Sequence, residues 1–316
     1  MERRDFLSHS VLAVLGLSTR DAFAEFASAQ PTAGTPIIDI HQHLGYSGRP
    51  DEALLAHQRT MGATTTILLP AGRPASGPST HGGVANGLQA QALGNEACYL
   101  FAQGHRQGFR FGANDVPDLE GATREIERYL KRGGVVIAEQ KFGVECDSLA
   151  MQEIYALARA YNVPVLMHWQ FGMYNHGFER FHRMLEKFTA VRFLGHAQTW
   201  WGNIDRKYGD QTVMYPNGPI TSGGLTDRYL SDYPNMYGDL AARSGLNALT
   251  RDEDFTREFL TRHRDKLLFG SDCSDRDGSG PACLGAQIIA AIRRLAANVQ
   301  IERRLLYENA KTLFRL

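Results

Sequence analysis

Ligand-type side chains stand where short apolar segments of the chain end. Asp39, His41 and His43 alternate at the end of the first such segment, so an extended strand would direct all three to one side. Three more residues each directly follow a later apolar run, namely His168, His196 and Asp272. Imidazole nitrogens and carboxylate oxygens are common ligands of zinc in proteins. The pattern predicts one divalent metal site assembled from four segments.

A further segment, residues 135–140, ends in side chains whose role the sequence leaves open. Glu139 and Lys141 lie two positions apart and so face the same side of an extended strand. Glu139 is expected as an additional metal ligand, because a carboxylate binds metal without chemical modification, and Lys141 is expected beside it. The alternative is an ion pair between these two side chains.

Short strand-like runs alternate with helical patterns from residue 37 onward. The expected strands are 37–40, 65–69, 110–113, 135–140, 163–167, 191–194, 236–240 and 267–270. The expected helices are 119–131, 149–161, 252–264, 282–295 and 302–314. This alternation predicts a single-domain α/β fold, a (β/α)8 TIM barrel, with an open doubly wound sheet as the alternative. Barrel enzymes carry their chemistry at the C-terminal ends of the strands, which is where the ligand-type residues lie.

These residues, in this order, resemble the amidohydrolase superfamily, and more closely its amidohydrolase-related (amidohydrolase 2) branch. The resemblance covers nearly all of the chain after residue 37, including Gly195-His196-Ala197 and Gly270-Ser271-Asp272. It implies a (β/α)8 barrel that holds a divalent metal, commonly zinc. The branch includes hydrolases, lactonases, hydratases and non-oxidative decarboxylases, so the resemblance implies the fold and the metal more closely than the substrate.

The resemblance also implies a role for each residue. His41, His43 and His168 are metal ligands. Asp272 is a ligand or the base that takes a proton from metal-activated water, and His196 binds metal or contacts the substrate. In related barrels the fourth strand supplies either a bridging Glu or a carbamylated Lys, so Glu139 and Lys141 leave the metal count at one or two.

Asp39 has two interpretations. In one, its carboxylate orients an imidazole ligand through the ring nitrogen that does not bind metal. In the other, it hydrogen-bonds local backbone at the end of the strand.

A long connection, residues 198–224, follows the sixth expected strand. It contains Trp200 and Trp201, which we expect to form the aromatic walls of a lid over the barrel mouth. The alternatives are a packed surface loop or a contact between copies of the chain in a homo-oligomer.

Residues 1–29 resemble a twin-arginine export signal. Arg3 and Arg4 precede an apolar run at 11–17, and small residues offer cleavage after Ala24 or Ala29. Residues 30–36 then form a linker to the barrel at 37–316. The expected mature protein is periplasmic or secreted, with no membrane anchor once the signal is removed. A simple amphipathic first helix is the alternative.

The charge and the cysteine content of the chain bear on its binding partner and on disulfide formation. The chain has 34 Lys and Arg against 34 Asp and Glu, which gives no basic surplus for nucleic acid and by itself indicates no partner. The partner expected for an enzyme of this kind is a small-molecule substrate. Cys273 and Cys283 flank a short loop and could form a disulfide in an exported protein, with free thiols as the alternative.

The expected activity is metal-dependent hydrolysis of a small ester, lactone or amide, with Asp272 as general base. The alternative is metal-dependent, non-oxidative decarboxylation of an aromatic or unsaturated carboxylic acid. A non-catalytic zinc-binding protein on the same barrel is a third hypothesis, which the presence of Asp272 disfavours.

Overall fold

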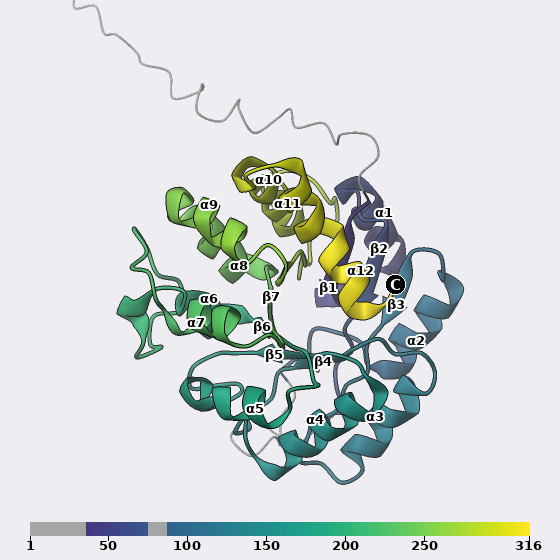
Figure 1. The fold of residues 1–316 in the computed structure, drawn as a ribbon. Coiled ribbons are helices and arrows are strands. Elements are labelled where there is room, and N and C mark those ends of the chain that lie inside the picture. Colours follow the sequence, from purple (N-terminus) through teal and green to yellow (C-terminus); the bar gives the residue numbers. More distant parts are fainter. Residues whose placement is uncertain (1–35, 75–86) are drawn as a thin grey trace, which may run out of the picture. The chain divides into compact units, whose positions relative to one another are not determined.

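The computed structural model describes residues 36–74 and 87–316. The expected export signal and most of the linker lie outside these residues. These described residues belong to one compact unit. Within its described part, eight strands lie inside a surround of helices (Figure 1).

All strand pairs are parallel. The first sheet contains β1 (Ile38–Gln42), β2 (Thr65–Leu68) and β3 (Phe109–Phe111). The second contains β4 (Ile137–Gln140), β5 (Val165–His168), β6 (Phe193–His196), β7 (Met236–Asp239) and β8 (Leu267–Leu268). Each strand overlaps one of the eight runs expected from the sequence.

Backbone hydrogen bonds close the two sheets into one barrel. The Ala113 N–H donates to the Val136 carbonyl at 2.8 Å, which joins the end of β3 to β4. The Ile40 N–H donates to the Phe269 carbonyl at 3.3 Å, which joins β1 to the segment after β8. This closure confirms the (β/α)8 barrel over the open sheet.

Helices follow the strands along the chain. Those in the first half are α1 (Asp51–Met61), α2 (Asn95–Gly104), α3 (Ala122–Leu130), α4 (Leu149–Tyr161), α5 (His182–Lys187) and α6 (Ala197–Gly202). Those in the second half are α7 (Leu225–Asp232), α8 (Ala242–Thr250), α9 (Glu253–Arg262), α10 (Leu284–Leu295), α11 (Val299–Arg303) and α12 (Asn309–Phe314). None of these described helices is both long and apolar enough to cross a membrane.

The last helical segment departs from the expected continuous helix at 302–314. A π-helical stretch, Arg304–Glu308, separates α11 from α12. Within it the Leu305 carbonyl accepts the Phe269 N–H at 2.9 Å. Because the Phe269 N–H bonds to Leu305, it does not continue the sheet, so β8 ends after two residues and does not extend to residue 270 as expected.

Apolar side chains fill the barrel and the space between strands and helices. One cluster combines a residue or two from most strands with the last helix: Ile38, Ile40, Ile67, Leu69, Val136, Ala138, Leu166, Leu194, Leu268, Ala310, Leu313 and Phe314. Helix α12 therefore packs against the interior residues of the barrel. The polar residues that follow these strands remain at the opposite, C-terminal end.

Candidate metal centre

Four ligand atoms from two strand ends and the loop after β8 converge at the barrel mouth. The Nε2 atoms of His41 and His43 lie 3.3 Å apart, and Glu139 Oε2 lies 3.4 Å from each. Asp272 Oδ1 lies 3.4 Å from His43 Nε2 and 3.9 Å from His41 Nε2. Two ligands bound tetrahedrally at about 2.0–2.1 Å from zinc are about 3.3 Å apart, so this set has the spacing of a metal site.

A second set shares two of these carboxylates. Glu139 Oε1 accepts a hydrogen bond from His168 Nδ1 and lies 3.8 Å from His196 Nε2. Asp272 Oδ2 lies 3.7 Å from the same His196 nitrogen. Each carboxylate thus directs one oxygen to the His41–His43 pair and the other to His196. The structure therefore brings together all five expected ligands, together with His196.

Several buried atoms in this cluster have no protein partner within the described residues. Glu139 Oε2, Asp272 Oδ1 and His196 Nε2 are buried without a hydrogen bond. An unsatisfied buried polar atom costs about 1–3 kcal/mol. These same atoms face the shared centre, so the residues present fit a divalent cation.

The charges of the cluster also suit a cation. Burial raises the pKa of the Glu139 carboxyl, but the charges of His168 and His41 outweigh burial and hold that pKa well below its usual value. For Asp272, burial is likewise outweighed by the charge of His41 and by the nearby His196 and His43 side chains, so its pKa is also well below the usual range. Both side chains are therefore ionised at neutral pH.

Hydrogen bonds fix the orientation of the two histidines on β1. The Nδ1–H of His41 donates to Asp239 Oδ2 at 2.6 Å, and the Nδ1–H of His43 donates to the Leu69 carbonyl at 2.8 Å. Both Nε2 atoms are thereby left facing the centre. Asp239, the last residue of β7, was not expected from the sequence, because the apolar residues Leu240 and Ala241 follow it directly.

Asp39 does not orient an imidazole. Its Oδ1 accepts the backbone N–H groups of His41 and Ser271, and its Oδ2 accepts hydrogen bonds from Gln58 and the Ser271 hydroxyl. The strand register shifts between Asp39 and Gln42, so Asp39 does not share a face with the two histidines. It connects β1 to the segment after β8, as the backbone interpretation proposed.

Lys141 lies beyond the end of β4. Its Nζ is 5.6 Å from the centre of the Tyr174 ring, and no ion pair joins it to Glu139 in the part of the chain that the structure describes. Glu139 instead faces the histidines. Lys141 therefore contributes positive charge near the site. Burial lowers the pKa of His168, and the charge of Lys141 lowers it further, to about 4.

The prediction that Trp200 and Trp201 form an aromatic lid is wrong. Trp200 and Trp201 belong to α6, which begins immediately after His196, and both indoles are buried. The Trp200 ring packs over Gly195 of β6, and Trp201 Nε1 donates to the Asp239 carbonyl at 2.9 Å. They pack against the backbone that carries the candidate metal ligands and do not line the mouth.

Other residues form the rim. Gln170 hydrogen-bonds His168 Nε2 at 3.2 Å and contacts the sulfur atoms of Met173 and Met214, so two loops meet beside this ligand. Large apolar side chains are exposed on the same loops, namely Phe171, Met173, Val213 and Tyr215. Tyr46 also lies at the centre, where its ring contacts the His43 ring edge-on. The negative charge of Asp272 raises the pKa of the Tyr46 hydroxyl.

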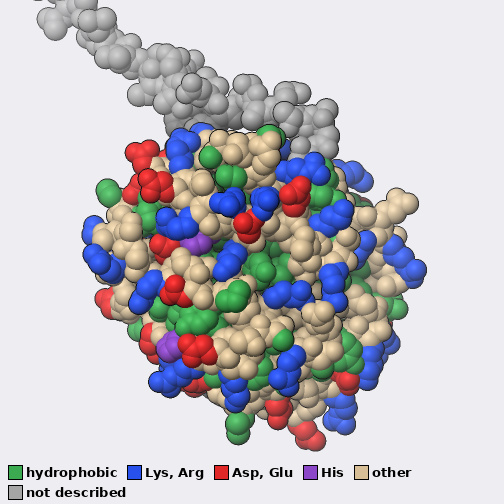
Figure 2. Space-filling view, viewed as in Figure 1, with side chains coloured by type: hydrophobic (Ala, Val, Ile, Leu, Met, Phe, Trp, Pro, Cys, Tyr) green, Lys and Arg blue, Asp and Glu red, His purple; other side chains and the backbone are tan. Residues whose placement is uncertain are grey.

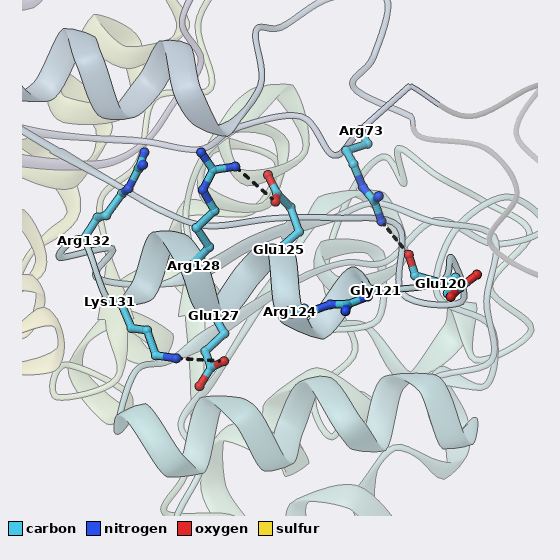
Figure 3. Close-up of a pocket in the computed structure, with 9 residues that line it drawn as sticks. All are labelled: Arg73, Glu120, Gly121, Arg124, Glu125, Glu127, Arg128, Lys131 and Arg132. Atoms are coloured by element: carbon cyan, nitrogen blue, oxygen red, sulfur yellow. Dashed lines mark hydrogen bonds and ion pairs between the residues drawn. The ribbon is translucent and has the colours of Figure 1, made fainter.

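On the face of the molecule shown in Figure 2, basic and acidic side chains are interspersed and do not form a large patch of one sign of charge. A groove on α3 is lined mostly by charged residues that pair with one another, such as Arg128 with Glu125 and Lys131 with Glu127 (Figure 3). It contains none of the convergent ligands. The barrel mouth is therefore the candidate site.

Solved structures match this chain over most of its length, whereas no family model and no curated protein matches it. An uncharacterised TIM-barrel protein from Bordetella bronchiseptica has a TM-score of 0.59 at 14% identity, covering 89% of this chain and 98% of that one. A probable 2-pyrone-4,6-dicarboxylic acid hydrolase from Acinetobacter baumannii has a TM-score of 0.56 at 14% identity, covering 89% and 99%. A dihydroxybenzoic acid decarboxylase from Polaromonas, with bound manganese, has 0.55 at 14%, covering 90% and 98%. The chain shares their barrel fold.

Proposed function

We propose that the protein is a metal-dependent hydrolase of a small ester, lactone or amide. The observation that carries this proposal is the position of Glu139 and Asp272, each of which directs its two oxygens to different sets of histidines. A pair of ions held between such carboxylates is typical of enzymes that activate water for displacement at a carbonyl or phosphoryl group. We infer one bound ion at His41 and His43 and a second at His168 and His196.

The divalent ion, zinc or manganese, supplies Lewis acidity that polarises a carbonyl group and makes water more acidic. Asp272 is the ligand most open to solvent, with a side chain 13% exposed against 1% for Glu139. It therefore takes the proton from the attacking water and returns it to the leaving group. His196, whose Nε2 lies 3.7 Å from Asp272 Oδ2, binds the second ion. The exposed apolar side chains of the rim bind the remainder of the substrate.

Decarboxylation of an aromatic or unsaturated acid is the competing function, because the structures of similar fold include a hydrolase and a decarboxylase. A decarboxylase uses the ion to hold the substrate carboxylate and needs no attacking water. The two reactions are separated by their products.

The test is a substrate panel with the purified, metal-loaded protein. Esters, lactones and amides are assayed for acid release, and aromatic acids for carbon dioxide. We expect acid release, reduced about 10²–10⁴-fold in Asp272→Asn. Carbon dioxide from the aromatic acids with no hydrolysis would contradict the proposal, as would full activity of Asp272→Asn.

We also propose that the protein is exported through the twin-arginine signal at its N-terminus. Mass spectrometry of the protein recovered outside the cytoplasm should find it shortened after Ala24 or Ala29. Substituting Arg3→Lys together with Arg4→Lys should retain the full-length chain inside the cell. Export of the doubly substituted chain at the normal level would contradict this proposal.

A further inference from the structure

A separate group of metal-binding side chains lies behind the barrel mouth. His57 lies on α1, Cys273 lies in the segment after β8, and Cys283 is the N-cap residue of α10. The two sulfur atoms are 3.8 Å apart, and Cys283 Sγ is 3.4 Å from His57 Nε2. All three side chains are almost completely buried. Neither the hydrolytic nor the decarboxylating reaction uses any of them.

The spacing is that of ligands around a metal ion. Two thiolates bound tetrahedrally at about 2.3 Å from zinc lie about 3.8 Å apart, and a thiolate and an imidazole lie about 3.6 Å apart. A disulfide requires about 2.05 Å between the sulfurs. The observed separations match the first geometry and leave the cysteines unbonded to each other.

The surrounding structure holds these ligands in place. The Cys273 carbonyl accepts hydrogen bonds from Arg49 Nη1 at 2.8 Å and Gln42 Nε2 at 3.1 Å. Cys283 Sγ accepts the Ala286 N–H at the start of α10 at 3.3 Å. His57 Nδ1 is buried with no hydrogen-bond partner among the described residues, so the polar contact of this ring is the one that Nε2 makes with sulfur.

We propose that His57, Cys273 and Cys283 bind a thiophilic d¹⁰ ion, Zn²⁺ or Cu⁺, at a site distinct from the barrel mouth. Thiolate ligands select such ions, and each thiol releases its proton to solvent on binding. The ion would connect α1, α10 and the segment that begins with Asp272. It is a structural site that positions Asp272, and it does not depend on which reaction the barrel mouth performs.

Metal analysis of the full chain, purified under reducing conditions without chelator, tests the proposal. The protein is supplied with Zn²⁺ in one arm and with Cu⁺ in the other, and bound metal per chain is measured. We expect Cys273→Ser and Cys283→Ser each to lose about one equivalent of the ion that the wild type retains. Serine preserves the cap of α10, and circular dichroism checks that each variant is folded.

Two matched controls and one spectrum make the result specific. Cys98→Ser and Cys146→Ser remove buried thiols elsewhere and should keep the full metal content. Loading with Co²⁺ should give a sulfur-to-metal charge-transfer absorption in the wild type and in His43→Ala. The same absorption should be absent from both cluster variants.

Equal metal content in wild type and cluster variants, with no charge-transfer absorption, would overturn the proposal. A disulfide would also overturn it: wild-type protein purified in parallel without reductant would then have a mass lower by two hydrogens, with Cys273 and Cys283 resistant to alkylation. Neither outcome would affect the proposed hydrolysis, which is measured separately through product formation.

Discussion

Asp239 shows how one residue outside the expected ligand set can control the site. Its carboxylate accepts the His41 Nδ1–H at 2.6 Å and lies 3.3 Å from His196 Nδ1, so it holds one imidazole from each set of ligands. It is completely buried. Carboxylates that hydrogen-bond metal-binding histidines fix the ring orientation and increase its basicity.

We expect Asp239→Asn to weaken metal binding about 10–100-fold, because the amide holds the imidazole less firmly and without charge. Titration of metal-free protein with Zn²⁺ measures the change. The control is Asp232→Asn, an exposed residue on α7, which should bind metal like the wild type. Unchanged affinity in Asp239→Asn would mean that Asp239 has no part in holding the ligands.

Secondary-structure elements were the most predictable level of this fold. Helix α4 matches the expected 149–161 because its ends are marked in the sequence: Ser148 accepts the Met151 N–H, and Asn162 takes a left-handed conformation. His41, His43, His168 and Asp272 were predictable for the same reason, since each directly follows an apolar strand.

Other features depend on contacts that sequence spacing does not contain. The register shift in β1 removes Asp39 from the face of the histidines, although strict alternation places it there. The indoles of Trp200 and Trp201 were expected at the surface, but α6 turns them against β6 and β7. The site of His57, Cys273 and Cys283 joins three separate elements with no common motif.

The contact between β6 and α6 gives a prediction about stability. A Cβ atom at Gly195 would lie 2.3 Å from the Trp200 ring, so Gly195→Ala should destabilise the protein by about 1–3 kcal/mol. Gly104→Ala is the control: nothing lies within 4 Å of its added methyl group, and its stability should stay equal or rise slightly. Urea unfolding compares the two. Equal stabilities would show that Trp200 can move aside without cost.

Helices α7 and α9 are joined by a buried carboxylate. Burial raises the pKa of Asp227, but hydrogen bonds from His263 and Arg262 outweigh burial and hold that pKa below its usual value. Such a group stabilises the fold above its unfolded pKa of about 3.9, and the contribution is lost as the pH falls through the lower, folded value.

We therefore expect Asp227→Asn to be less stable than wild type by about 1–3 kcal/mol at pH 7, with the difference shrinking below about pH 4. Denaturant unfolding at pH 7 and at lower pH measures this difference. Asp232→Asn on the same helix should show little change at either pH. A difference for Asp227→Asn that does not depend on pH would exclude the ionised carboxylate as its cause.

At the scale of the whole barrel, three carboxylates lie close together at the candidate metal centre. Glu139, Asp239 and Asp272 all have lowered pKa values and are ionised together at the end of the sheet. A bound cation should relieve their repulsion and connect strands from both sheets. A ligand that binds only the folded state at 100 times its Kd adds about 2.7 kcal/mol to stability.

Removal of metal with a chelator should lower the midpoint of thermal unfolding, and added Zn²⁺ or Mn²⁺ should restore it. Scanning calorimetry of wild type and His43→Ala makes the comparison. The shift should be smaller in the variant, because one ligand is missing at the barrel mouth. Identical midpoints with and without chelator would contradict a metal-stabilised barrel.

The packing of helix α12 against the barrel interior limits how early during synthesis the barrel can be completed. Its residues Ala310, Leu313 and Phe314 pack with the interior residues of the barrel, and the π-helical stretch before it holds the backbone after β8. These residues must therefore leave the ribosome before the interior of the barrel is fully packed. His41 is synthesised long before Asp272, so we expect an ion held by both side chains to bind only after Asp272 has left the ribosome.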